Sequence, residues 1–519
     1  MLSLRQSLAT IGKHPPIRIP SDIPIPCKSL LDTLIVWNHI PYELLIIAPQ
    51  EFVEAVKPLA THKNNTGIST RILNLEQIYQ TYPGRDEAEK VKHCLALFQP
   101  NNSVRYVMLV GDGDKLPARY VKWWNLVYTH TSDPEFHTLY IPVDLYYGAL
   151  FRQSDNSFDD WDGNQDGYFG EIPDPSSNDP VNPDMVNVIP LLAIGRIPAS
   201  TVDEVKVYVQ KVIDYEIGAY NSSWTKAALL VATSDWVPGI CTKQEDIAAK
   251  YLQGFTVHKL YQQDLSLRQS LAEIKKNPPI RIPGEISIPS KSLRDTLTTW
   301  KPYSCQVTES PSPGAINTYL NQGVGLVSYN GHGGSSGWGI PNGGYRLSDV
   351  ANLSNSGKLP VVFSTGCDTG SFTVFPPISA YQDINGNLHQ GTNDGEVFRP
   401  DPPPQPACLQ PKDYESMAEG MTVMRETGAI AYVGSVTTGQ YPNLELLKFF
   451  FQAIPVPAGC ETLGKMWLHM LQTYYSESGH VPPNPSAAAK AVTDLIFFVE
   501  PWKLHLFGDP SLRVLGIPH

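Results

Sequence analysis

The stretches VGLVSYNGHGG (324–334) and PVVFSTGCDTG (360–370) decide the fold of this chain. Each begins with a short run of apolar and β-branched residues and ends in glycines and polar side chains. Such runs are typical of strands that are buried on both faces, as the strands of a parallel sheet are. Because parallel strands need long crossover connections, the chain around these stretches is expected to supply helices.

Five further runs share this pattern and are listed here: LLIIA (44–48), RYVMLVG (105–111), VNVIPLLAIG (186–195), AALLVA (227–232) and AIAYVG (429–434). Helical patterns lie between them. The clearest spans 201–217, where Thr201 and Glu204 form a capping box and valines at helical spacing make one apolar stripe. Further helices are expected near 50–60, 85–98, 243–254, 312–322, 413–427, 443–453 and 461–475. Alternating strands and helices predict an α/β fold with mostly parallel sheets, in which ligands bind at the carboxyl ends of the strands.

The charge balance and the cysteine pattern exclude several classes of protein. There are 51 acidic and 39 basic residues, a net charge of −12 without a basic cluster, so nucleic acid is not an expected partner. No apolar run approaches the ~20 residues of a membrane span, and MLSLRQSLATIGKHPP (1–16) lacks the apolar core of a signal peptide. The seven cysteines contain no CxxC pair, so neither a disulfide framework nor a zinc knuckle is expected.

An internal repeat interrupts the α/β pattern. Residues 2–37 recur at 265–300, with 26 of the 36 positions identical. Both copies contain the segment PPIRIP, which favours extended backbone over helix. A pair of docking arms would explain the repeat, and so would a duplicated surface segment, because long loop insertions are tolerated at little cost.

Three predicted strands end in groups that could act together in catalysis. Strand 227–232 leads to Asp235, strand 324–329 to His332 and strand 360–365 to Cys367. If these strands are neighbours, an acid, an imidazole and a thiol converge at one edge of the sheet. Nucleophilic catalysis needs a thiol to attack, a base to move the proton and a third group to orient the imidazole. A lone buried cysteine or histidine is usually structural, but here both groups are bracketed by glycines that would let a substrate approach the backbone.

The motifs around these residues resemble the gingipain-type cysteine peptidases, relatives of the caspases and legumains. Those that carry the resemblance are YNGHG (329–333), GWG (337–339), TGCDTGSF (365–372), MAEGMTVMRETGAIAYVGS (417–435) and LFGDPSLRV (506–514), with YVMLVGD (106–112), VDLYYG (143–148), AIGRIPAS (193–200) and KVIDYE (211–216) upstream. The resemblance implies two caspase-like α/β/α subdomains. The predicted parts are an N-terminal segment 1–42 with the first repeat copy, an N-terminal subdomain 43–220, and a catalytic subdomain 221–519 with inserts at 265–303 and 377–412.

The resemblance also implies roles for individual residues. His332 and Cys367 would form the catalytic dyad, the backbone N–H groups of Gly333 and Cys367 the oxyanion hole, and Asp235 the acid that orients the histidine. Asp246 would be the acid of the S1 pocket and Tyr441 an aromatic wall of that pocket. An acid in this position favours a basic P1 side chain through a charge-assisted pair. The alternative for Asp246 is the solvated face of a helix, next to Glu245.

The acidic loop 159–171 is a second candidate site. Its candidate ligands are Asp160, Asp162, Asn164, Asp166 and Glu171, with Gly167 available for a sharp turn. Oxygen ligands of this kind suit a hard cation such as calcium, although the twelfth position counted from Asp162 is Pro173 rather than the glutamate of an EF-hand. The alternative is an acidic surface turn. The resemblance to a calcium-using family favours a structural ion, with no cofactor required for catalysis.

These observations predict a cysteine endopeptidase that acts on protein or peptide substrates, with a preference for basic P1 residues as one hypothesis. Two alternatives stay open: a processing transpeptidase of the same family and a catalytically silent, calcium-stabilised binding or surface module. The insert 377–412, which follows the Cys367 strand, would form a flap over the cleft or a disordered loop. The resemblance implies a secreted or cell-surface protein, whereas the N-terminal residues carry no export signal.

Overall fold

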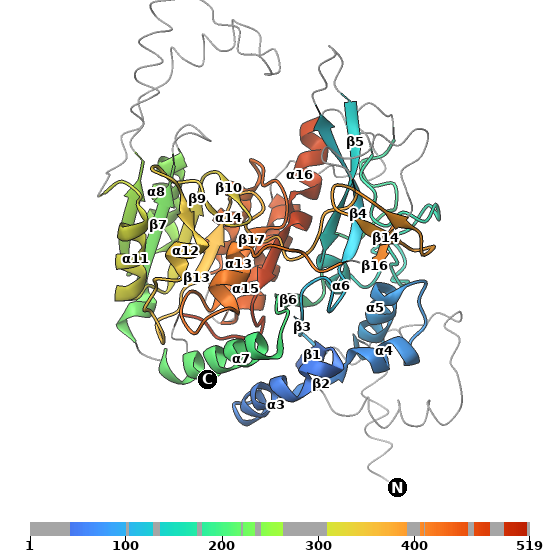
Figure 1. Cartoon of the computed structure of the whole chain (residues 1–519), viewed down its shortest axis with the longest axis horizontal. Helices are drawn as coiled ribbons and strands as arrows, with labels where there is room; N and C mark the ends of the chain where they lie inside the picture. Colours follow the sequence, from blue (N-terminus) through green and yellow to red (C-terminus); the bar gives the residue numbers. More distant parts are fainter. Residues whose placement is uncertain are drawn as a thin grey trace, which may run out of the picture.

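The computed structural model describes residues 42–99, 103–127, 135–173, 179–219, 222–233, 240–262, 309–391, 405–408, 410–454, 461–477 and 492–515 (Figure 1). Both copies of the repeat lie outside the described residues, so the two explanations for it stay predictions. No helix among the described residues is long and apolar enough to span a bilayer.

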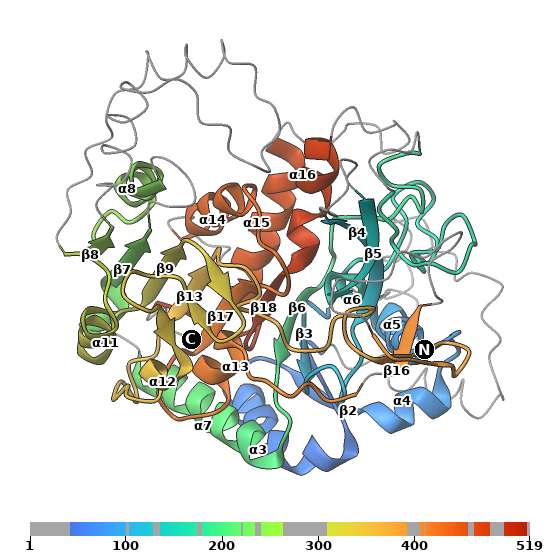
Figure 2. The same ribbon diagram turned by 45° about the horizontal axis from the view of Figure 1, so that its top comes forward.

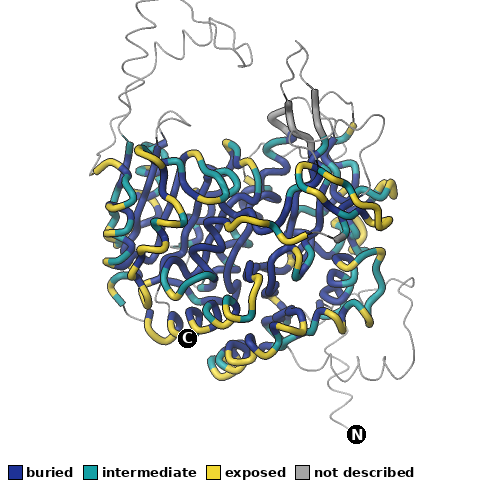
Figure 3. Tube along the Cα trace, in the orientation of Figure 1, coloured by how far each residue is buried: buried dark blue, intermediate teal, exposed yellow. Residues whose placement is uncertain are grey.

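A ten-stranded sheet forms the centre of the molecule, and its strand order is β2-β1-β3-β6-β18-β17-β13-β9-β7-β8. The bounds are β1 (Leu44–Ala48), β2 (Thr70–Asn74), β3 (Tyr106–Val110), β6 (Ala193–Ile197), β7 (Ala227–Ala232), β8 (Thr256–Tyr261), β9 (Leu326–Asn330), β13 (Val361–Ser364), β17 (Ala431–Ser435) and β18 (Leu504–Phe507). Most of these strands are buried over their whole length (Figure 3). The prediction of fully buried parallel strands is therefore confirmed. The predicted run 186–195 is the exception, because β6 begins only at Ala193.

The C-terminal strand β18 joins two blocks of parallel strands that run in opposite directions. It pairs parallel to β6 and antiparallel to β17. The carboxyl ends of β7, β9, β13 and β17 consequently lie at one edge of the sheet, and those of β1, β3 and β6 lie at the other. The sheet is continuous across the predicted boundary at residue 220, so the division into two subdomains stays a prediction.

Helices cover both faces of the sheet. Their bounds are α3 (Gln50–Asn65), α4 (Leu75–Thr81), α5 (Glu87–Phe98), α6 (Leu145–Gly148), α7 (Val202–Gly218), α8 (Ile240–Tyr251), α11 (Pro313–Gln322), α12 (Leu347–Val350), α13 (Met417–Thr422), α14 (Asn443–Gln452), α15 (Leu463–Glu477) and α16 (Val492–Lys503). Figure 2 shows α8, α14, α15 and α16 on one side of the sheet and α7, α11, α12 and α13 on the other. The capping box of Thr201 and Glu204 opens α7 as predicted, whereas α13 is much shorter than the predicted 413–427.

The insert 377–412 does not form a flap over the Cys367 edge in its described part. It forms a small sheet of β14 (Tyr381–Asp383), β15 (Leu388–His389) and β16 (Pro406–Cys408), beside the hairpin of β4 (Arg119–Val127) and β5 (Glu135–Val143). The Tyr140 amide donates to the Pro376 carbonyl at 2.8 Å, and Tyr120 on β4 hydrogen-bonds Thr373 at 2.9 Å. These contacts carry the chain away from Cys367 and onto the N-terminal half, so the flap prediction is wrong for these residues.

Candidate active site

The carboxyl ends of β9 and β13 bring the two predicted dyad residues to one edge of the sheet. The strands are parallel neighbours, with Ser364 opposite Tyr329, and β7 pairs with the other side of β9. His332 follows β9 and is exposed, and Cys367 follows β13 and is partly exposed. Among the cysteines whose side chains the structure describes, Cys94 and Cys367 are free; Cys94 is buried, whereas solvent reaches Cys367.

The two loops touch directly through their backbones. A Cβ atom added to Gly333 would lie 2.8 Å from the Cys367 carbonyl oxygen and 2.9 Å from the Gly366 Cα. Real Cβ atoms do not approach backbone so closely, so only glycine fits at 333. The glycine that follows the histidine therefore allows the imidazole-bearing loop to pack against the thiol-bearing turn.

The GWG motif (337–339) contacts the loop that carries His332 and fixes its backbone. The Gly339 amide donates to the His332 carbonyl at 2.7 Å, and the Trp338 ring stacks on Tyr329 with centroids 4.6 Å apart. The indole N–H also donates to the Tyr432 hydroxyl at 3.0 Å. A buried tryptophan that is both stacked and hydrogen-bonded has little freedom, so the backbone at His332 is well fixed.

Cys367 sits between its own turn and the loop that follows β17. Its thiol donates to the Gly439 carbonyl with Sγ and O 3.6 Å apart, and the Asp368 amide donates to the Thr437 carbonyl at 3.0 Å. Asp368 adopts φ 58°, a left-handed conformation that few non-glycine residues occupy and that often marks functional turns. Within the described part of the chain, no acceptor is found for the Cys367 N–H, whereas the amides of Thr365 and Gly366 are both bonded.

Burial and the nearby carboxylates favour the neutral form of the Cys367 thiol. Burial raises the pKa of Cys367, the charges of Asp368 and Glu500 raise it further, and Lys503 opposes them. Burial also raises the pKa of Asp368 to about 6. A thiol of this kind is a poor nucleophile by itself and needs a base to accept its proton.

The orienting acid cannot be placed, because Asp235 lies outside the described residues. The end of β7 is nevertheless beside the end of β9, since the Thr233 amide donates to the Asn330 carbonyl at 3.0 Å. The assignment of Asp235 stays a prediction.

The two predicted S1 residues lie close to one helix. Asp246 is exposed on α8, and Tyr441, with 47% of its surface exposed, ends the loop that contacts Cys367. Lys243, one turn before Asp246, has its Nζ 3.4 Å from the Tyr441 hydroxyl and 4.7 Å from the ring centroid. The structure thus adds a lysine that the sequence analysis did not consider. Cys241, on the same helix, is disulfide-bonded, which the cysteine pattern did not predict.

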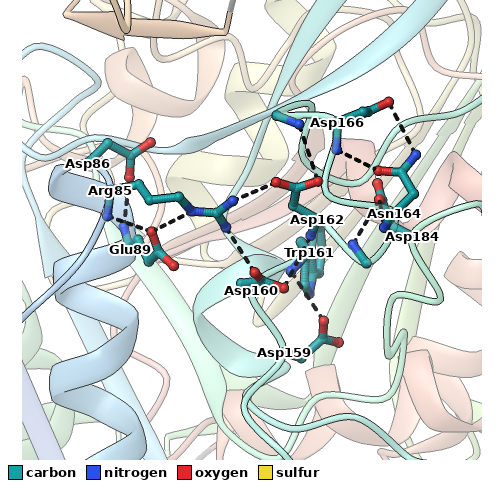
Figure 4. Close-up of polar contacts among 12 residues, drawn as sticks. Arg85, Asp86, Glu89, Asp159, Asp160, Trp161, Asp162, Asn164, Asp166 and Asp184 are labelled. Atoms are coloured by element: carbon teal, nitrogen blue, oxygen red, sulfur yellow. Dashed lines mark hydrogen bonds and ion pairs between the residues drawn. The ribbon is translucent and has the colours of Figure 1, made fainter. Parts of the chain in front are cut away.

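Cationic side chains hold the acidic loop 159–171, and Figure 4 shows one of them, Arg85, with its carboxylate partners. Arg85 binds Asp162 through Nη1 at 2.5 Å and Asp160 through Nη2 at 3.0 Å, and Arg152 binds Asp160 at 3.0 Å. Lys122 binds Glu171 at 2.9 Å. In the described segments no group of three or more His, Cys, Asp or Glu side chains is placed to hold a metal ion. The side chains as arranged therefore do not fit the calcium site that the sequence predicted.

The predicted ligand Asn164 and one residue absent from the sequence-based prediction, Asp184, organise this loop. Asn164 donates to Asp166 and to Glu171, each at 3.1 Å, and the buried Asp184 accepts the amides of Gly163 at 3.0 Å and Glu171 at 2.9 Å. Burial raises the pKa of Asp184 to about 8. Asp184 is 13 residues beyond the loop, so no local motif connected it with the acidic cluster.

Comparison with known proteins supports the resemblance that the motifs carry. The sequence matches the profile of peptidase family C25 over residues 38–515. The chain belongs to peptidase family C25. Gingipain R2 and gingipain R1 of Porphyromonas gingivalis are each 22% identical to it over 338 residues, or 65% of this chain. The chain matches 33% of the length of gingipain R2 and 25% of that of gingipain R1.

Solved structures confirm the fold of this C25 family member. The crystal structure of the Arg-specific cysteine proteinase gingipain R superimposes with a TM-score of 0.53 at 17% identity, covering 91% of this chain and 78% of that one. A complex of the pro- and mature domains of a Porphyromonas gingivalis gingipain gives 0.52 at 17% identity, with 91% and 79% covered. The caspase-like α/β prediction is therefore confirmed.

Proposed function

We propose that this C25 family member is a cysteine endopeptidase in which Cys367 and His332 form the catalytic dyad. The observation that supports this most is the backbone contact between Gly333 and the Gly366–Cys367 turn at the carboxyl edge of neighbouring parallel strands. A thiol and an imidazole on two touching loops, both reachable from solvent, are the groups that acyl transfer through a thioester requires.

The reaction proceeds in two steps. His332 accepts the thiol proton while Sγ forms a bond to the substrate carbonyl carbon, and the Cys367 N–H stabilises the oxyanion that results. The C–N bond then breaks, His332 returns the proton to the leaving amine, and an acyl-enzyme remains. Water attacks the thioester with the same imidazole as base, which releases the acid and restores the thiol.

A preference for basic P1 residues is the finer part of the proposal. Asp246 and Tyr441 lie on elements beside the loop that contacts Cys367, and gingipain R, whose fold this chain shares, is an Arg-specific enzyme. A carboxylate and an aromatic ring that line one pocket would suit a guanidinium or ammonium side chain. Lys243, on the same helix as Asp246, contacts Tyr441, and its positive charge would weaken the preference for a basic P1 side chain.

The test is hydrolysis of peptides that differ only at P1, comparing Arg, Lys, Leu and Glu. We expect cleavage by the wild-type protein and none by Cys367→Ala, while Cys94→Ala keeps its activity because that thiol is buried away from the site. Turnover by Cys367→Ala would refute the dyad. Addition of a primary amine separates hydrolysis from the transpeptidase alternative, which would give an amide product, and a catalytically silent module would show neither product nor labelling of Cys367 by a thiol-directed probe.

A further inference from the structure

The loop 437–440, which follows β17, is hydrogen-bonded to the turn that carries Cys367. The thiol donates to the Gly439 carbonyl, and the Asp368 amide donates to the Thr437 carbonyl. Two successive residues at the end of the β13 turn are therefore bound to one loop. A shift of this loop would move the sulfur relative to the histidine loop, which is fixed separately by Trp338.

This loop is in turn held by two charged side chains of α16. The Glu500 carboxylate accepts the Gln440 amide at 2.7 Å. The Lys503 ammonium donates to the Thr438 carbonyl at 3.1 Å and to the Gln440 side-chain oxygen at 2.8 Å. The backbone carbonyl of Lys503 also accepts the Val436 amide at 2.8 Å. The loop thus receives its polar partners from a helix more than 50 residues further along the chain.

The two side chains form a fully buried ion pair. Glu500 is 0% exposed, Lys503 is 1% exposed, and their charged atoms are 2.7 Å apart. Apolar residues of the same size usually serve stability as well as a buried ion pair does, because desolvation offsets the attraction. Stability alone is therefore a poor explanation for this pair. Its contacts instead satisfy the backbone of an irregular loop, as buried polar backbone requires.

We propose that Glu500 and Lys503 are positioning residues for Cys367, which hold the loop 437–440 so that the Gly439 carbonyl directs the thiol toward the histidine loop. The proposal rests on the proposed function, because it assigns the pair a role in the reaction of Cys367. It also implies that the loop is fixed before substrate binds, since every contact is made within the protein.

The charges of the pair also reach the thiol. Burial is the main reason that the pKa of Cys367 is raised, with Asp368 and Glu500 adding to it and Lys503 lowering it. Glu500 and Lys503 therefore act on the thiol pKa in opposite directions. Loss of the Glu500 charge should lower the thiol pKa, loss of the Lys503 charge should raise it, and loss of both should give a value between those of the two single variants.

The experiment compares Glu500→Gln, Lys503→Met and the double variant. Glu500→Gln keeps an oxygen that can accept the Gln440 amide, Lys503→Met removes both donations to the loop, and the double variant leaves no unpaired buried charge. The readouts are kcat and KM for peptide hydrolysis, the pH dependence of Cys367 alkylation by iodoacetamide, and the thermal midpoint. The control is the Lys63→Met/Glu216→Gln/Asp509→Asn triple variant, because Lys63 on α3 forms fully buried pairs with Glu216 on α7 and with Asp509, and the triple variant also leaves none of these three charges unpaired.

We expect kcat to fall about ten-fold in Lys503→Met and in the double variant with KM unchanged, since a misplaced reacting atom costs rate more than binding. Alkylation should move to lower pH in Glu500→Gln, to higher pH in Lys503→Met and back toward wild type in the double variant. The control variant should lose thermal stability but keep the wild-type kcat and the wild-type alkylation profile. The proposal is overturned if the two single variants and the double variant all fold, keep the wild-type kcat and show the wild-type alkylation profile.

The design separates this proposal from the proposed function. Alkylation reports on the thiol whether or not the protein cleaves peptides. If the wild-type protein shows no turnover while the alkylation profile shifts as described, the peptidase assignment fails and the positioning of Cys367 by the pair stands.

Discussion

Gly333 and Cys367 are in such close contact that a Cβ atom at 333 would lie 2.8 Å from the Cys367 carbonyl oxygen. The contact joins the loop after β9 to the turn after β13, and both strands are fixed by their hydrogen-bonded register. Neither loop can shift without displacing the end of the strand that precedes it, β9 or β13. The separation of the imidazole and the thiol therefore depends on the absence of a side chain at this position.

Gly333→Ala should separate the two loops and disable the site. Because the neighbours of the added methyl group are backbone atoms, they cannot rotate away, and a displacement of this kind costs about 100-fold in kcat/KM. The measurement is peptide hydrolysis together with a thermal midpoint to show that the variant is folded. Gly334→Ala is the control, since a Cβ there meets no atom within 4 Å. Equal activity of the two variants would show that the loop contact does not matter.

Asp368→Asn should stabilise the protein at pH 8 and make Cys367 more reactive. Burial raises the pKa of Asp368 to about 6, so its stabilising contribution is complete below the unfolded value near 3.8 and is lost as the pH rises through about 6. Asparagine avoids the buried charge and tolerates the φ of 58°. We expect about 1–2 kcal/mol more stability at pH 8 than wild type and no gain at pH 4.

The same substitution removes a charge that raises the pKa of Cys367. Alkylation of Cys367 should therefore begin at lower pH in Asp368→Asn, measured against the Asp349→Asn control, whose carboxylate caps the separate helix α12. A later onset, or a loss of stability at pH 8, would contradict the assignment of a raised pKa to Asp368.

The strand ends that carry His332 and Cys367 could be predicted because the relevant signals are local. Runs such as LLIIA (44–48) and AALLVA (227–232) have the same bounds as β1 and β7, and the glycines at 333 and 366 mark a close approach of the two backbones. The strands β2 and β8 were missed because they lie at the two ends of the sheet and are only partly buried, so their apolar runs are incomplete.

The parts of the site that the sequence did not predict depend on contacts between distant segments. Glu500 and Gln440 are 60 residues apart, and no spacing rule connects them. The helix that carries Glu500 contains Pro501, which weakens the helical pattern, and β18 after it runs opposite to β17. The contacts of Arg85 with the acidic loop are of the same kind, because Arg85 is more than 70 residues from Asp160 and Asp162 in the sequence.

Lys243→Ala should strengthen the preference for a basic P1 residue. The lysine lies over the Tyr441 ring one turn from Asp246, so its charge opposes that of an arriving arginine or lysine side chain. For partly exposed charges a few ångströms apart we expect about a three- to ten-fold rise in kcat/KM for Arg over Leu at P1. Lys250→Ala is the matched control, because Lys250 is on the same helix but over Tyr251. If the ratio of kcat/KM for Arg to that for Leu at P1 is unchanged in Lys243→Ala, the S1 pocket lies elsewhere.

Arg85→Met should destabilise the protein, and chelation of calcium should not. Arg85 contacts Asp160, Asp162 and Glu89, and Asp162 has a side chain that is only 2% exposed. Removal of the cation leaves buried carboxylates unpaired, which costs about 3 kcal/mol in the free energy of unfolding. The measurement is denaturant unfolding, with Arg105→Met as control because its pair with Glu43 is solvent-exposed and worth about 0–1 kcal/mol. In wild type, Arg85, Arg152 and Lys122 already pair with Asp160, Asp162 and Glu171, so the thermal midpoint should be the same in EDTA and in calcium. A fall in EDTA would show that an ion displaces Arg85 and would restore the calcium site.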